Sequence, residues 1–166
     1  LGNLMEEKKL SVADEVVAKE EIWDARFDFN KLIKQTVKAL AQKTQMLALA
    51  ATNQGDIYHA GYANILSTSE FYDIDVTRGV LALLDETEEI QRLFDKSFGE
   101  GPIHFLLSDE LGAEYFEPCA LVFTHFKAGK KEGSLGVIGP NRLNYPLVVP
   151  VVKCFGELIE ELMKNL

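Results

Sequence analysis

The chain has 166 residues, of which 47% are hydrophobic, 26% charged and 10% aromatic. This length fits one globular domain, and 5 prolines and 12 glycines are too few for a collagenous, linker-like or disordered chain. Seventeen basic and 26 acidic residues give a formal net charge of −9. Such a surface repels phosphate backbones as a whole, which excludes a free-standing DNA-binding module.

No membrane span is expected, because the longest apolar run, residues 145–155, is interrupted by two prolines and a lysine. Cys119 and Cys154 lie in apolar stretches without the spacing of a zinc site or a disulfide framework. We expect both to be buried thiols of a soluble, cytoplasmic protein. The sequence starts with Leu1 instead of methionine and shows no signal peptide, which suggests that the chain begins inside a longer protein.

Two helices are predicted at the start of the chain. Ser11 can cap a short charged helix towards Trp23, whose thin apolar face is typical of a connector that needs a partner to stay folded. Asp28 or Asn30 can begin a second helix, which runs to about Gln45. Its apolar positions recur every three to four residues, and its opposite side carries Lys31, Lys34, Lys38 and Gln42.

The middle of the chain predicts two strands and a helical stretch. Residues 46–51 and 57–60 are apolar runs around a turn at 53–56. After Phe71, we expect Asp75 or Thr77 to cap one helical stretch that continues through an acidic segment to Phe94.

The last third predicts strands at residues 103–107, 119–126 and 134–138, with a hairpin loop at 128–133. A final helix carries a broad apolar stripe from Val148 to Leu162. Strands grouped between helices, without regular alternation, indicate an α+β fold in which helices cover one face of a small antiparallel sheet.

No catalytic or metal centre is predicted. His59, His104 and His125 lack the short spacing that fixes two metal ligands on one face, and a Cys119–His125 pair on one strand is too far apart for catalysis. The glycines at 133, 136 and 139 lack the pattern of a phosphate-binding loop. Arg142 either anchors the Gly-Pro turn through carbonyl or carboxylate groups or binds a ligand, and we favour the anchor.

The segment from Gly133 to Tyr145 resembles the C-terminal signature of the HrcA family of heat-inducible transcription repressors. In that family the pattern reads approximately Gly-x-x-Gly-x-Ile-Gly-Pro-Thr-Arg-Met-x-Tyr. Three further stretches agree in order with the family: residues 4–11 with the tail of its winged-helix region, residues 61–71 with its Gly-x-x-Asn-Leu-Leu segment, and Cys119 with a strand entry. The signature residues are Gly136, Ile138, Gly139, Pro140, Arg142, Tyr145, Gly61 and Asn64.

The resemblance implies a GAF-like regulatory domain over residues 28–166, and a connector over residues 1–27 that follows a winged helix outside this chain. It implies a homodimer, operator DNA bound only through the missing N-terminal domain, and dependence on a GroEL-type chaperonin, with no cofactor and no enzymatic activity. Residues 46–58 bridge the place where the family inserts a dimerisation domain, so we expect that insertion to be absent.

Another surface must then hold the dimer. The candidates are the helices at residues 31–45 and 148–162, or the connector around Trp23. The alternative to a repressor domain is a GAF-like small-molecule sensor of another signalling protein.

Overall fold

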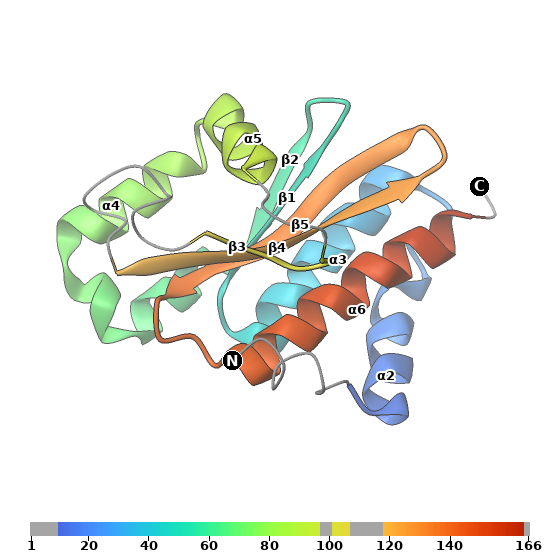
Figure 1. Ribbon diagram of the computed structural model, residues 1–166, viewed down its shortest axis with the longest axis horizontal. Helices are drawn as coiled ribbons and strands as arrows, with labels where there is room; N and C mark the ends of the chain where they lie inside the picture. The colour runs from blue at the N-terminus through green and yellow to red at the C-terminus, as the bar shows by residue number, and fades with distance from the viewer. Residues whose placement is uncertain (1–9, 97–100, 107–117, 165–166) are drawn as a thin grey trace.

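The computed structural model describes residues 10–96, 101–106 and 118–164 (Figure 1). Its strands form one antiparallel sheet in the order β2-β1-β5-β4-β3. The strand bounds are β1 Leu47–Thr52, β2 Ile57–Ala60, β3 His104–Leu106, β4 Cys119–Ala128 and β5 Lys131–Pro140. The predicted α+β class, a small antiparallel sheet covered by helices, is confirmed.

The hairpin of β4 and β5 is longer than predicted. Its register runs from Cys119 opposite Pro140 to Ala128 opposite Lys131, so the loop shrinks to two residues. Gly129 takes a φ of 67°, a conformation that suits the first position of a two-residue hairpin loop. Past the apolar core the register places Lys127 opposite Glu132, and opposite charges stabilise such cross-strand pairs.

Three helices form the layer on one face of the sheet, where α3 and α6 contact the strands and α2 packs on α3 and α6 (Figure 1). They are α2 Val12–Trp23, α3 Phe29–Thr44 and α6 Tyr145–Met163. The side chains of Ser11 and Asp28 cap α2 and α3 by accepting backbone N–H groups of the first turns, as the sequence predicts for Ser11 and allows for Asp28. Ala18 and Ile22 of α2 are fully buried in this layer, so one side of α2 is part of the core.

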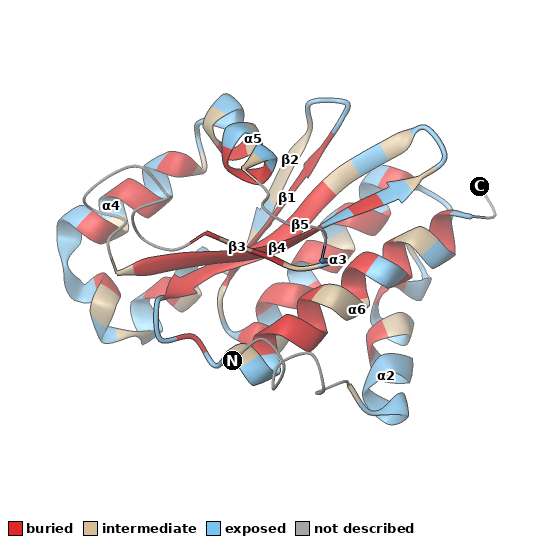
Figure 2. Cartoon of the chain, in the orientation of Figure 1, coloured by how far each residue is buried: buried red, intermediate tan, exposed pale blue. Residues whose placement is uncertain are grey.

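The other face is also covered, by α4 Ile74–Leu83, α5 Thr87–Asp95 and the 3₁₀ turns η1 Tyr62–Ser67 and η2 Ser69–Tyr72. The sequence predicted helical cover on one face of the sheet and did not predict this second layer. Leu49 of β1 and Leu121 and Phe123 of β4 are buried on this second side. The central strands are buried along most of their length (Figure 2). Because their apolar side chains belong to two core clusters, one on each face, each face needs its own layer.

The single helical stretch predicted up to Phe94 is divided into α4 and α5. The side chain of Asp73, rather than Asp75 or Thr77, caps α4 by accepting the N–H of Asp75. Short backbone bonds, including Glu86 N–H to the Leu83 carbonyl at 3.0 Å, tighten the chain after α4. The two short helices can then each turn an apolar side towards the sheet.

Among the described residues, no helix combines the length and apolar character that crossing a membrane requires. The longest helix, α6, carries its apolar stripe on the side that packs against the sheet.

We expect Phe155→Ala to lower the free energy of unfolding by about 3–5 kcal/mol, because a fully buried ring of α6 leaves a cavity. The control is Leu147→Ala on the same helix, where the side chain is 47% exposed and the cost should stay below about 1 kcal/mol. Urea unfolding followed by circular dichroism measures both; equal losses would contradict the packing of α6.

Candidate functional site

The signature segment forms the turn between β5 and α6. The N–H of Asn141 donates to the Pro118 carbonyl at 2.7 Å, and the N–H of Leu143 donates to the Pro140 carbonyl at 3.0 Å. The Tyr145 hydroxyl donates to the Asn141 carbonyl at 2.9 Å. With the Leu143 side chain buried, the turn is held by backbone bonds, one tyrosine hydroxyl and apolar packing.

Arg142 pairs with Glu70 of η2 through two parallel bonds. Its Nε donates to Oε2 at 2.6 Å and its Nη2 donates to Oε1 at 2.9 Å. The hydrogen bond from Arg142 lowers the pKa of the Glu70 carboxyl, and that carboxylate raises the pKa of the guanidinium. Because a bidentate pair fixes both planes, Arg142 joins the β5–α6 turn to the second helical layer.

Gly61 and Asn64 meet the chain between α3 and β1. The Asn64 Nδ2 donates to the Met46 carbonyl at 2.9 Å and to the Ala41 carbonyl at 3.4 Å. Gly61 has a φ of 82°, and a Cβ there would lie 2.7 Å from the Met46 carbonyl oxygen. Only glycine fits this left-handed position and this close approach. The side-chain amide of Asn64 therefore donates to backbone carbonyls at the end of α3, where the hydrogen bonds of the helix stop.

The β5–α6 turn approaches the same residue. A Cβ at Gly139 would lie 2.6 Å from the Met46 sulfur and 2.5 Å from Leu143 Cδ2. Signature residues that are far apart in the sequence thus converge on Met46. We call this cluster of Met46, Gly61, Asn64, Gly139 and Leu143 the Met46 junction.

Gly136 and Ile138 lie further along β5. A Cβ at Gly136 would lie 2.4 Å from the Val122 carbonyl oxygen and 2.5 Å from Phe123 Cβ. Ile138 is buried in the second layer of the core. The structure therefore places the signature residues at the turn, at the Met46 junction and in the sheet. Glu70, the partner of Arg142, was missed as a site residue, although it lies in the segment that resembles the family.

The cysteines are not activated nucleophiles. Burial raises the pKa of Cys119 to about 12 and that of Cys154 to about 11, so both stay protonated at neutral pH. The expected burial is correct for Cys119, whereas Cys154 is only half-buried.

Two of the three histidines come together without forming a metal site. The rings of His104 and His125 lie 4.9 Å apart between centroids, and His125 Nδ1 is 2.7 Å from Ser134 Oγ. Burial, with the nearby His104, lowers the pKa of His125. His59 lies on the edge strand β2, away from this pair. Within the described ranges, no group of three or more histidine, cysteine or acidic side chains is arranged to hold a metal.

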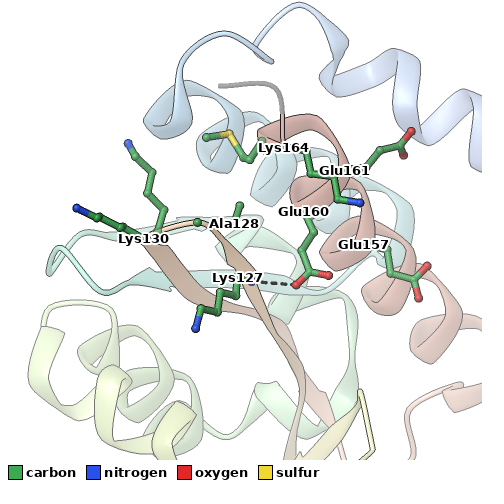
Figure 3. Close-up of a pocket in the computed structure, with 10 residues that line it drawn as sticks. Lys127, Ala128, Lys130, Glu157, Glu160, Glu161 and Lys164 are labelled. Carbon is green, nitrogen blue, oxygen red and sulfur yellow. Dashed lines mark hydrogen bonds between the residues drawn. The ribbon is translucent and has the colours of Figure 1, made fainter.

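Two surface grooves are lined by charged and polar side chains. The first lies between the β4–β5 hairpin and the end of α6, where the N–H of Lys127 donates to Glu160 Oε2 at 2.9 Å (Figure 3). The second, the α3 groove, lies between α3, the end of α2 and β2. It is lined by Lys31, Lys34, Lys38, His59, Glu21 and Asp24 among others.

Comparison with known proteins gives a consistent result. The family model described as the HrcA protein C terminal domain matches residues 1–149. A heat-inducible transcription repressor HrcA of Syntrophobacter fumaroxidans is 26% identical over 167 residues, covering 99% of this chain and 47% of that protein. The same-named protein of Moorella thermoacetica is 28% identical over 123 residues, covering 74% of this chain and 35% of that protein. The chain thus spans about half the length, or less, of these curated relatives.

Among solved structures, a crystal structure of a hypothetical protein matches with a TM-score of 0.69 at 12% identity. The match covers 82% of this chain and 68% of that chain. At this identity the similarity shows the fold alone.

We expect Gly136→Ala to lower the free energy of unfolding by about 3 kcal/mol or more, because the new Cβ meets the backbone of β4. Gly139→Ala should cost about 1–2 kcal/mol, because its new Cβ meets the ends of two flexible side chains. Thermal and urea unfolding of both variants test this order, and a reversed order would contradict the β4–β5 packing.

The Arg142–Glu70 pair should stabilise the fold in a pH-dependent way. Because the folded-state pKa of Glu70 is lowered, its contribution is present at neutral pH and is lost as the pH falls through that pKa, below the ordinary range of a glutamate. Wild type should therefore exceed Glu70→Gln in stability at pH 7, with a difference that shrinks towards pH 3. Arg142→Lys serves as the control, since a lysine cannot make the two parallel bonds.

Proposed function

We propose that this chain, which belongs to the HrcA family, is the regulatory domain of a heat-inducible transcription repressor. The match of the C-terminal domain model over residues 1–149 carries this proposal. The relatives it matches bear the name of repressors rather than of enzymes. In agreement, Arg142 and Asn64 are engaged in holding segments of the fold together.

In this proposal, residues 1–27 connect residues 28–166 to an N-terminal winged helix that reads an inverted-repeat operator. The packing of α2 supports such a connection. Lys19 of α2 pairs with Glu161 of α6 at 2.9 Å, and Glu21 pairs with Lys43 of α3 at 3.1 Å. A shift of α3 or α6 would therefore move α2, and with it the spacing of two DNA-binding domains in a dimer.

We further propose that α2 forms the dimer contact. The apolar faces of α3 and α6 are buried against the sheet, so they offer little surface to a second copy. By contrast, α2 and the residues after it expose Val12, Val16, Trp23 and Phe27, with Val12 at 77% and Phe27 at 71%. Helical spacing places Val12, Val16 and Trp23 along one side of α2, away from the buried Ala18 and Ile22, and Phe27 lies in the turn after α2. We call these four residues the connector stripe.

In this proposal, the domain senses heat by unfolding. An unfolding enthalpy of roughly 100 kcal/mol for a domain of this size makes its thermal transition narrow. A GroEL-type chaperonin that refolds the domain would restore repression when chaperonin is free. During heat the chaperonin is occupied by other unfolded proteins, so repression is lost.

We expect light scattering at micromolar concentration to show a dimer, because the connector stripe is too apolar to remain exposed. Val16→Asp should yield a folded monomer, since it places a charge within the stripe. The control, Leu81→Asp, changes a 38% exposed residue of α4 and should leave the dimer intact. A wild-type monomer, or equal behaviour of the two variants, would contradict the proposed interface.

The function itself is tested with the natural full-length protein and DNA from upstream of the chaperone genes of the same genome. We expect a gel shift that is lost after heating and recovered faster with added GroEL-type chaperonin and ATP. Failure to bind any such fragment would overturn the repressor assignment.

A further inference from the structure

Charge is distributed unevenly across the two faces of the sheet. Helix α3, on one face, contains four lysines and no acidic residue. On the other face, residues 70–96 contain eight carboxylates and three basic side chains. The net charge of −9 therefore hides one positive helix, α3, whose neighbours α2 and α6 carry seven acidic and two basic residues, and a strongly negative layer across the sheet.

The positive charge of α3 lies on a continuous polar face of this helix. Lys31, Lys34 and Lys38 follow one another at helical spacing, so they lie along one side over a rise of about 10 Å. All three are exposed, and their side chains line the α3 groove. No ion pair is recorded for these three lysines in the described part of the chain, whereas Lys43 is paired with Glu21. The three charges thus remain available to an outside anion.

The composition of this face fits a polyanion better than a protein. Gln35 and Gln42 line the same groove as the lysines, and the large exposed apolar side chains of the described residues all lie outside α3. Protein interfaces need buried aromatic or aliphatic anchors and are depleted in lysine. Lysine and glutamine side chains are instead common donors to phosphate oxygens.

We propose that the solvent face of α3 contacts the phosphate backbone of operator DNA, beside the site read by the DNA-binding domain. The proposal rests on the proposed repressor function. Helix α2 packs directly on α3, so the lysines lie next to the segment that leads to the DNA reader. The acidic α4–α5 layer lies across the sheet from α3 and faces away from the DNA.

Two carboxylates also line the α3 groove, and they limit where the backbone passes. Glu21 is neutralised by Lys43 at 3.1 Å, and Asp24 lies at the C-terminal end of α2. The phosphates therefore pass along the lysines of α3 and not over the end of α2. Three point charges along one helix face give affinity and orientation without reading bases.

The test compares the natural full-length protein with a Lys31→Gln, Lys34→Gln, Lys38→Gln variant on operator DNA between 50 and 200 mM salt. Three lost phosphate contacts should reduce the slope of log affinity against log salt by about 2.7. Between 50 and 200 mM salt, the affinity of the variant should therefore fall roughly 40-fold less than that of the wild type. Because phosphate contacts carry no sequence information, affinity for a scrambled duplex should fall in parallel with operator affinity.

A matched control changes three exposed lysines of the first groove, Lys127→Gln, Lys130→Gln and Lys164→Gln (Figure 3). This variant alters the net charge equally but should keep the wild-type slope, and thermal unfolding should show both variants folded. Equal slopes for wild type and the α3 variant, or an equal loss in the control, would overturn the α3 contact while leaving the repressor function intact. If the wild-type protein bound no DNA, both proposals would fall.

Discussion

The Met46 junction is the constraint on which the arrangement of the two helical layers depends. Helix α3 ends in the left-handed conformation of Gln45, and the carbonyl of Met46 follows at once. That carbonyl accepts its bond from Asn64, and the Met46 side chain packs against Gly139. Met46, between α3 and β1, therefore contacts both of the other parts. The second layer contacts it through the Asn64 amide, and the β5–α6 turn contacts it through the close packing of Gly139.

The Arg142–Glu70 pair complements this junction from the surface. The junction fixes where η1 begins, and the bidentate pair fixes η2 against the turn before α6. Together they connect residues that are distant in the sequence into one signature, because Asn64 and Arg142 each make their hydrogen bonds to a residue of another segment. Gly61 and Gly139 both lie against Met46, which belongs to neither of their segments.

The sequence predicted well the features that depend on neighbouring residues, and poorly those that depend on contacts between distant residues. The caps at Ser11 and Asp28 and the apolar stripe of α3 depend on neighbours in the sequence, so they could be read directly. The cover on both faces was missed, although β1 is buried at every position and its nearly continuous apolar run is typical of a strand covered on both faces. The partner of Arg142 likewise depends on a contact 72 residues away, which no spacing rule contains.

The glycines of β5 show how the same residues lead to opposite interpretations. A phosphate loop uses glycines to bring an anion close to the backbone, whereas Gly136 and Gly139 bring parts of the protein itself close. Net charge is ambiguous in the same way, because it sums over faces that never meet the same partner. An acidic total therefore excludes a free-standing DNA reader, but it does not exclude a basic helix face that meets DNA once a separate domain has brought it there.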